Sequence, residues 1–230
     1  MEEILDLQYK DLKVIQDPSG YCFTSDSVLL ANYVKSKTND IVVEFCAGSG
    51  VISILLSGKQ KMKKIYAFEF QKRLCDMFKK STALNKLEDK IEVINDKLEN
   101  ATKYIRQEGA DIVFCNPPYH EGGDKSENIE IAIATHEIET SLESIVLNAN
   151  KVLKFGGKFY MVHRVDRLVD VLVTLRKYKI EPKSICIVYP KSDNEPVVFL
   201  VTAIKGGRKG LRMSKVKFAD EFNKSCQIFD

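Results

Sequence analysis

The sequence predicts an α/β fold, in which helices cover both faces of a mostly parallel β-sheet that carries an antiparallel hairpin at its edge. Between residues 41 and 177, short apolar runs typical of buried strands alternate five times with helical segments. Beyond residue 183, two apolar runs, residues 184–189 and 196–203, are separated only by a polar loop. A plain dinucleotide-binding fold would keep alternating, so the closing hairpin argues for a different sheet.

Composition indicates one large domain in a reducing compartment. The chain has 230 residues, of which 44% are hydrophobic and 29% charged, enough for a sizeable core and a polar surface. No apolar run approaches a membrane span, and Met1-Glu2-Glu3 does not resemble a signal peptide. The six cysteines form no C-x-x-C pair, and three scattered histidines predict no metal site. We therefore expect a cytoplasmic protein whose net charge of +3 does not by itself indicate a nucleic-acid partner.

The expected elements follow from these periodicities in chain order. Ser25 or Asp26 can cap a first helix, whose apolar face includes Val28, Leu29 and Val34. The five strands that alternate with helices are expected at residues 41–46, 64–69, 91–96, 111–115 and 158–162. The helices that follow them are expected at residues 51–56, 71–84, 141–153 and 165–177, and a further helix before the fourth strand is expected to finish at residues 104–109.

Four of these strands end in groups that suit a ligand, and ligands of open α/β sheets bind beyond the carboxyl ends of the strands. Gly48 and Gly50 allow a backbone to approach a ligand closely. Glu69 follows about 20 residues later, the spacing of a ribose-binding acid, and Asp96 is suited to accept from an adenine amino group. Taken singly, each acid is equally compatible with a helix N-cap and the glycines with a plain turn. Four such groups at strand ends, in chain order, together favour a ligand site.

The fourth strand ends in Asn116-Pro117-Pro118-Tyr119. Each proline ring fixes φ and lacks an N–H, so neither a helix nor a sheet ladder continues here. The result is a stiff corner that presents an amide, a prolyl carbonyl and an aromatic ring at the same sheet edge. An ordinary turn explains the tetrapeptide alone, and the other strand ends make a site the better interpretation.

Together, the segment from Glu44 to Gly50, the two strand-end acids and the Asn-Pro-Pro-Tyr motif resemble the class I S-adenosylmethionine-dependent methyltransferases, and within them the enzymes that methylate amino groups. Cys46 departs from the resemblance, since the family often has glycine there. The resemblance implies a Rossmann-like, seven-stranded sheet whose last strand is antiparallel. It also implies that S-adenosylmethionine contacts Glu44, Cys46, Gly48, Gly50, Glu69, Asp96 and Asn116.

The two ends of the chain narrow the resemblance. Residues 20–30 are similar to the N-terminal signature of the bacterial enzymes that methylate N6 of adenine 37 in valine tRNA, and residues 203–211 are similar to their basic glycine-rich tail. This implies a single domain with an N-terminal substrate segment (1–40), a cofactor-binding core (41–204) and a basic tail (205–230). The expected partner is a tRNA. The protein itself is expected to be a monomer or a weak homodimer.

For such an enzyme, we expect the Asn116 side-chain oxygen and the Pro117 carbonyl to accept the two N–H bonds of an adenine amine. Tyr119 would stack on the flipped base. Phe23 is expected either as a second wall of the base site or as part of the core. His120 is more simply a loop residue or phosphate contact than a base, and we assign no role to His136 or His163.

The basic tail is the nucleic-acid signal. No acid occurs between Lys205 and Asp220, which favours phosphate contacts over a merely solvated surface. The residues expected to contact RNA in this way are Lys205, Arg208, Lys209 and Arg212.

Other functions stay open at this stage. The same motif serves methylation of guanine N2 in ribosomal RNA and of glutamine in release factors, although about forty residues are too few for the helical domain that precedes the motif in the glutamine enzymes. A catalytically silent RNA-binding protein of the same fold is a further alternative. A nicotinamide dehydrogenase is disfavoured because the third glycine of its phosphate-binding pattern is missing.

Overall fold

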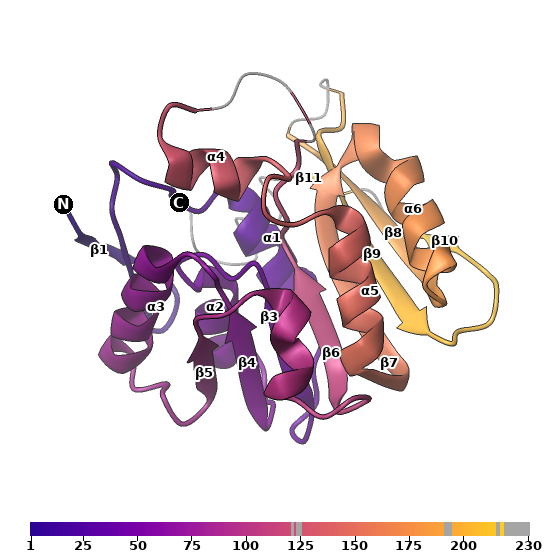
Figure 1. Cartoon of the computed structure of the whole chain (residues 1–230), viewed down its shortest axis with the longest axis horizontal. Helices are drawn as coiled ribbons and strands as arrows, with labels where there is room; N and C mark the ends of the chain where they lie inside the picture. The colour runs from indigo at the N-terminus through magenta and orange to yellow at the C-terminus, as the bar shows by residue number, and fades with distance from the viewer. Residues whose placement is uncertain (121, 123–125, 191–194, 215–216, 219–230) are drawn as a thin grey trace.

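The fold is a twisted sheet between two layers of helices (Figure 1). A computed structural model describes residues 1–120, 122, 126–190, 195–214 and 217–218. The predicted tail therefore lies partly outside the described residues, as does Cys226.

Seven long strands form the sheet in the order β5-β4-β3-β6-β7-β9-β8. All neighbours are parallel except β9, which is antiparallel to both β7 and β8, so the predicted closing hairpin and mostly parallel sheet are confirmed. Two strands of two residues each, β10 (Arg212–Met213) and β11 (Lys217–Phe218), add to the outer edge of β8. The long strands are β3 (Ile41–Phe45), β4 (Lys64–Phe68), β5 (Ile91–Ile94), β6 (Ala110–Cys115), β7 (Leu153–Arg164), β8 (Ile180–Tyr189) and β9 (Val198–Lys205).

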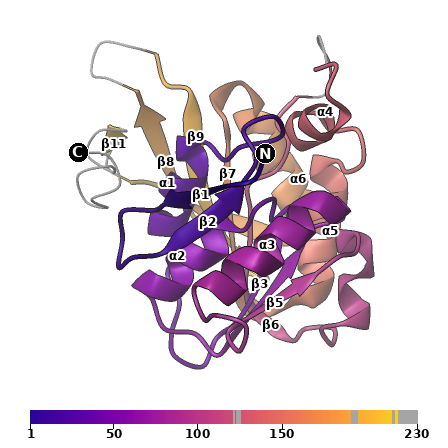
Figure 2. The same cartoon turned by 90° about the vertical axis from the view of Figure 1, so that its left-hand side faces the viewer.

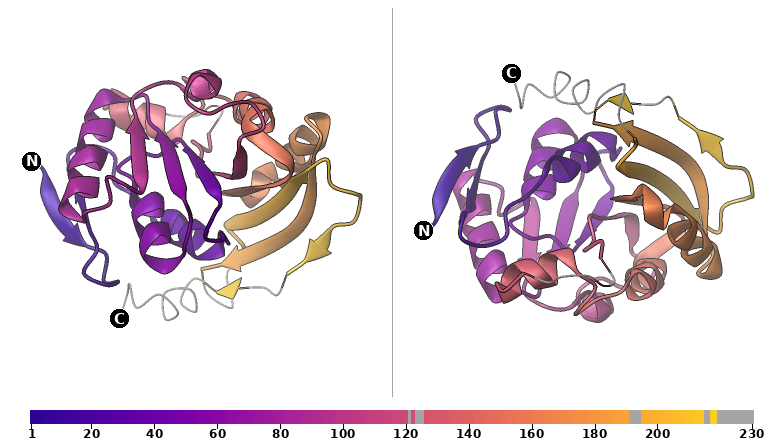
Figure 3. Two further views of the ribbon diagram at one scale, coloured as in Figure 1. Left: turned by 90° about the horizontal axis from the view of Figure 1, so that it is seen from below. Right: turned by 90° about the horizontal axis from the view of Figure 1, so that it is seen from above.

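Helices α1 (Ser25–Tyr33), α2 (Val51–Lys59) and α3 (Lys72–Leu84) cover one face of the sheet. Helices α5 (Leu142–Val152) and α6 (Leu168–Lys177) cover the other, together with the 3₁₀ helix η1 (Leu98–Lys103), while a short 3₁₀ turn, η2 (Val165–Arg167), leads into α6. The two views along the strands in Figure 3 show these layers. Because the strands are covered on both sides, their side chains on both faces are buried.

Two local expectations are wrong. The helix expected at residues 104–109 is not formed: these residues make turns, and the helical segment is η1, which ends at Lys103. Tyr104 instead turns back, packs edge-on against the Phe68 ring at 5.7 Å and bonds to Asp96. At α1, the N-cap is Thr24, which makes no side-chain capping bond, so Ser25 and Asp26 lie inside the first turn.

Two elements are additional to those expected from the sequence. A hairpin of β1 (Glu3–Asp6) and β2 (Lys13–Gln16) lies against α3, as Figure 2 shows, where the Ser81 hydroxyl accepts the Ile15 N–H at 2.8 Å. Helix α4 (Ile129–Thr135) lies above the carboxyl ends of the parallel strands (Figure 1). Of the two, α4 borders the region where the strand ends meet.

Candidate active site

The loop after β3 is a tight turn built from left-handed residues. Cys46, Gly48 and Gly50 have φ values of 57°, 55° and 84°, and the Gly50 N–H donates to the Ala47 carbonyl at 2.9 Å. A Cβ added at Gly50 would lie 2.0 Å from the Phe78 ring of α3, so only glycine fits between this turn and that helix. Gly50 therefore sets the packing of the loop, and its neighbours Cys46 and Gly48 face the pocket.

Glu69, directly after β4, joins this loop to the next one. Its carboxylate accepts the backbone N–H of Gly48 and of Gln71, each at 2.8 Å. Burial raises the pKa of Glu69 to about 7, against the lowering effect of these two backbone bonds. The carboxyl group thus titrates near neutrality at the base of the pocket.

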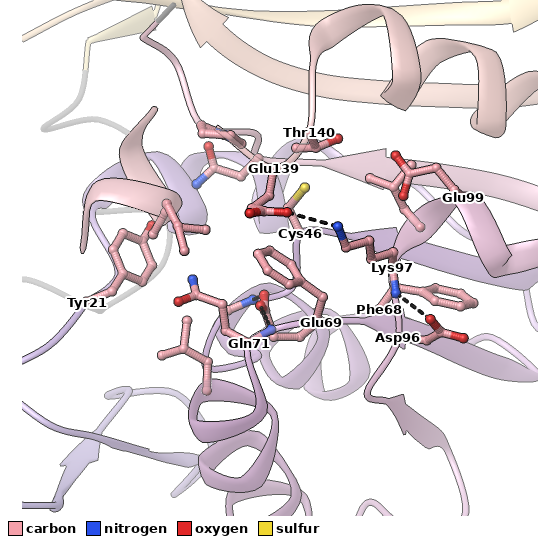
Figure 4. Close-up of a pocket in the computed structure, with 18 residues that line it drawn as sticks. Tyr21, Cys46, Phe68, Glu69, Gln71, Asp96, Lys97, Glu99, Glu139 and Thr140 are labelled. Atoms are coloured by element: carbon pink, nitrogen blue, oxygen red, sulfur yellow. Dashed lines mark hydrogen bonds and ion pairs between the residues drawn. The ribbon is translucent and has the colours of Figure 1, made fainter. Parts of the chain in front are cut away.

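A pocket of about 630 Å³ extends from the Gly48 loop along the carboxyl ends of β4 and β5 (Figure 4). Lys97 and Glu139 form an ion pair of 2.9 Å across it, and Tyr21 borders it at the other end. Its apolar lining consists of Phe68, Phe70, Leu74, Leu98, Ile133 and Ala134. An elongated pocket with apolar walls and one carboxylate at its base suits an adenosine group.

Asp96 lies on the rim of this pocket, at the end of β5. Its oxygens accept from the Asn100 amide at 2.7 Å, the Lys97 N–H at 2.8 Å and the Tyr104 hydroxyl at 3.0 Å. These bonds hold the pKa of Asp96 below its usual range, and the bond from Asn100 has the largest effect. Asp96 is therefore an ionised, oriented acceptor.

Glu44 lies behind the loop rather than in the pocket lining. It is fully buried in β3, and the Ser53 hydroxyl of α2 donates to one carboxyl oxygen. Its other oxygen has no hydrogen-bond partner among the described residues. Burial raises the pKa of Glu44 to about 8, so the group is protonated at neutral pH. Of the seven expected cofactor residues, five line the pocket, and Glu44 and Gly50 support the loop from behind.

The Asn116-Pro117-Pro118-Tyr119 corner stands at the end of β6, beside this pocket. The Asn116 amide nitrogen donates to the Ser27 hydroxyl at 3.2 Å, and its oxygen accepts from the Tyr119 hydroxyl at 2.6 Å. Within the described chain, no hydrogen bond is made to the Pro117 carbonyl. The Tyr119 ring is half-buried and lies 5.1 Å from the ring of His163.

A smaller hollow of about 280 Å³ connects the corner to the loop. Phe23 and Tyr21 from the N-terminal segment line it together with Asn116, Cys46 and Gly48. Phe23 also packs against the buried core, so both expectations for this residue apply in part. The N-terminal segment is thus one wall of the site.

The run of basic residues begins at the opposite edge. Because β9 is antiparallel, the chain leaves it at the amino ends of the parallel strands, opposite the corner after β6. Strands β10 and β11 then run parallel to β8 and lead back toward the carboxyl ends, with Arg212 paired to Ser184 and Lys217 to Val188. Lys205 is 13% exposed at its side chain, and its ammonium donates to the Asn150 and Leu153 carbonyls and to Glu108 at 2.7, 2.9 and 3.0 Å. Arg208, Lys209 and Arg212 are exposed.

The histidines are not arranged as bases. Burial lowers the pKa of His163 to about 4, and its Nδ1 accepts the Arg164 N–H at 2.9 Å. The His120 and His136 rings pack on each other at 5.2 Å. The described residues contain no group of three or more His, Cys, Asp or Glu placed to hold a metal ion, and no helix among them is long and apolar enough to cross a membrane.

Several pocket residues are additional to those expected. Phe70 and Lys97 directly follow Glu69 and Asp96 in the sequence. Their position next to the strand ends is the signal from which their place in the pocket could have been predicted. Ile133, Ala134 and Glu139 come from α4 and the segment after it, where the sequence has no periodic pattern.

Comparison with known proteins decides the family. Residues 19–173 match the family described as methyltransferase small domain, over more than half of the chain. The chain belongs to this methyltransferase family. It is therefore an S-adenosylmethionine-dependent methyltransferase, and the lined pocket with its buried carboxylate fits that cofactor.

Curated relatives are distant but cover most of the chain. A protein from Parabacteroides distasonis named tRNA1(Val) (adenine(37)-N6)-methyltransferase is 20% identical over 96% of this chain and 96% of its own length. One of the same name from Porphyromonas gingivalis is 19% identical over 82% of this chain and 76% of its own.

Solved structures share the fold. A predicted O-methyltransferase from Agrobacterium tumefaciens is similar with a TM-score of 0.70 and 18% identity, over 87% of this chain and 96% of that one. TYW2 from P. horikoshii, in complex with MeSAdo, is similar with a TM-score of 0.62 and 15% identity, over 90% of this chain and 72% of that one. These structures therefore confirm the class I methyltransferase fold expected from the sequence.

Proposed function

We propose that this enzyme transfers a methyl group to the exocyclic N6 amino group of adenine in tRNA, at adenine 37 of valine tRNA. The observation that carries the proposal is the corner after β6. There the Asn116 side chain stands beside the cofactor pocket, next to a Pro117 carbonyl that accepts no hydrogen bond from the described residues. Two acceptor groups fixed on a rigid strand end are suited to an amine with two N–H bonds.

The proposed catalysis rests on these acceptors. An exocyclic adenine amine is a poor nucleophile because its lone pair is delocalised into the ring. When the Asn116 oxygen and the Pro117 carbonyl accept its hydrogens, the nitrogen becomes pyramidal and the lone pair becomes available. The proton leaves readily from the methylated product, so positioning and electrostatics carry the reaction without a strong base.

The cofactor supplies an electrophilic sulfonium methyl group when bound. Glu69 would accept from its ribose hydroxyls, and Asp96 would accept from its adenine amino group, with Phe68, Phe70 and Leu98 as the apolar walls. The hollow lined by Tyr21 and Cys46 leads from this adenosine region to Asn116 and suits the methionine end.

Substrate contacts come from both ends of the chain. Tyr119 and Phe23 are the proposed aromatic contacts of the flipped base, although the Tyr119 ring is partly covered by His163. Arg208, Lys209 and Arg212 are exposed and are proposed to contact phosphates, whereas Lys205 is engaged inside the fold. Since β9 spans eight residues, the tail begins on the order of 25 Å from the strand ends, and β10 then brings Arg212 back beside Ser184 in the middle of β8.

The names of the curated relatives support adenine 37 of valine tRNA as the target. The test is incubation of the purified enzyme with labelled S-adenosylmethionine and total tRNA from a strain lacking the gene, followed by mapping of the label. We expect N6-methyladenosine at a single nucleotide of valine tRNA. Label on a guanine N2 would assign the enzyme to guanine methylation instead. Label on a release factor, with none on tRNA, would assign it to glutamine methylation, which the same corner can serve.

A further inference from the structure

Three oxygen atoms form a chain that leads from α1 to the corner after β6. The Tyr119 hydroxyl lies 3.0 Å from Oδ2 of Asp26 and 2.6 Å from Oδ1 of Asn116. Both contacts are of hydrogen-bond length, but a hydroxyl group carries only one hydrogen. The protonation state of Asp26 therefore decides which of its two neighbours receives that hydrogen.

With Asp26 ionised, its carboxylate can only accept, so it takes the hydroxyl hydrogen of Tyr119. The amide oxygen of Asn116 then has no donor from within the fold and is free for a substrate N–H. With Asp26 protonated, its own hydrogen goes to the Tyr119 oxygen, and Tyr119 donates to the Asn116 oxygen instead. In that state the proposed amine acceptor is already occupied.

The surroundings of Asp26 act on its protonation in opposite directions, with burial as the largest effect. Burial raises the pKa of Asp26, while its bond with Tyr119 and the charge of Arg164, at the end of β7, lower it. Tyr21 and Tyr119, the other ionisable groups that face it, stay neutral because burial raises the pKa of both. His163, packed on Tyr119, is neutral as well, since burial lowers its pKa to about 4.

We propose that Asp26 is a positioning residue for methyl transfer: its carboxylate accepts the Tyr119 hydroxyl hydrogen and so leaves the Asn116 amide oxygen free for the substrate amine. The inference rests on the proposed function of Asn116. It adds that the N-terminal segment, outside the cofactor pocket, controls whether the amine can be received. Asp26 does not line that pocket, so its effect is on turnover and not on cofactor affinity.

The kinetic test compares Asp26→Asn, Tyr119→Phe and the double variant. Asp26→Asn should lower kcat at least about tenfold, a loss equivalent to one hydrogen bond, and leave the cofactor Kd within about twofold. In the Tyr119→Phe enzyme no hydroxyl competes for Asn116, so adding Asp26→Asn should change kcat less than about twofold. Equal losses from Asp26→Asn in both backgrounds would overturn the inference.

The pH profile separates positioning from a structural role. In the wild-type enzyme kcat should fall on the acid side as Asp26 becomes protonated, and this acid limb should be absent from Asp26→Asn. Asp166→Asn is the matched control, because Asp166 also pairs with Arg164, at 3.2 Å, but is exposed and makes no bond to Tyr119. An acid limb that persists unchanged in Asp26→Asn would contradict the inference.

A readout without any substrate tests the geometry itself. In protein labelled with ¹³Cζ-tyrosine, the Tyr119 resonance is identified by its loss in Tyr119→Phe. It should shift with pH at the midpoint of the kinetic acid limb, and Asp26→Asn should remove that shift. No Asp26-dependent shift in the wild-type protein overturns the inference even if the enzyme is active. A clear shift in a protein that methylates no tRNA would overturn the proposed function and leave the hydrogen-bond exchange standing.

Discussion

The carboxylate of Glu69 accepts the backbone N–H of Gly48 at 2.8 Å, across the ends of two neighbouring strands. One buried acid therefore fixes the glycine loop after β3 and also stands at the base of the pocket. Since its pKa is raised to about 7 by burial, the group can change charge under physiological conditions. Under the proposed role of Glu69 in cofactor binding, this carboxyl group links cofactor binding to the order of the loop.

Glu69→Gln should weaken binding of S-adenosylmethionine by about ten- to hundredfold at pH 8, the cost of losing hydrogen bonds to a charged acceptor. An amide cannot accept from both the Gly48 and Gln71 N–H groups as the carboxylate does. Wild-type affinity should also rise about tenfold from pH 6 to pH 8, as Glu69 ionises, and the variant should lack this rise. Calorimetry at three pH values measures both.

The matched control for Glu69 is Glu139→Gln. Glu139 lines the opposite wall and pairs with Lys97, but it is 38% exposed, so its loss should change the Kd less than about threefold. Equal affinity of wild type and Glu69→Gln would remove Glu69 from the cofactor site.

Glu44 should make stability depend on pH. Its pKa is about 8 in the folded chain and 4.5 ordinarily, so between these values the folded state binds one proton more than the unfolded state. Stability must then fall as pH rises through this window, by up to about 1.4 kcal/mol per pH unit from this group. Glu44→Gln should flatten the pH dependence of the free energy of unfolding, measured by urea denaturation without cofactor. Glu92→Gln, at an exposed residue, should leave that pH dependence unchanged. A Glu44→Gln profile as steep as wild type would contradict the burial argument.

Cys46 occupies a backbone conformation that favours glycine, with φ of 57°. Cys46→Gly should relieve about 1 kcal/mol of strain, offset in part by the greater freedom of the unfolded chain, so stability should stay equal or rise slightly. Cys46→Val should lose more than about 1 kcal/mol, because a β-branched side chain fits this region poorly. Urea denaturation of both variants is the measurement. A glycine variant less stable than the valine variant would disprove the assignment of strain.

Lys205 and Lys209 should behave differently, although both belong to the same basic run. Lys205→Ala removes the donor to two carbonyls and should cost about 1–3 kcal/mol of stability without changing the salt dependence of tRNA binding. The exposed Lys209→Ala should keep stability within about 0.5 kcal/mol and reduce that salt slope by about one. The reverse pattern would assign Lys205 to the RNA surface and Lys209 to the fold.

The sheet and its ligand edge were predictable because the information is local. Buried parallel strands appear as continuous apolar runs, and the polar residue that ends each run, such as Glu69 or Asp96, necessarily emerges at one edge. Cys46 itself has the left-handed backbone that favours glycine, the residue that the sequence resemblance leads one to expect there.

The remaining features depend on tertiary contacts. Strand β1 is exposed along its length and α4 has only seven residues, so neither produces a hydrophobic period. The helix expected at residues 104–109 fails because Tyr104 is held by Phe68, which is distant in sequence, and by Asp96. Asp26 has the pattern of a helix cap, and only the fold reveals that it faces Tyr119. The tail starts at the edge opposite the corner because of the direction of β9, and β10 and β11 then lead it back along β8.

The central claim is that the Asn116 side chain receives the amine that is methylated. Asn116→Ala therefore should lower single-turnover methyl transfer to tRNA by at least about a thousandfold, as for loss of an acceptor used throughout the reaction. Its affinity for S-adenosylmethionine, measured on the same preparation, should stay within a few-fold of wild type. Retained transfer by a folded, cofactor-binding Asn116→Ala enzyme would contradict the account.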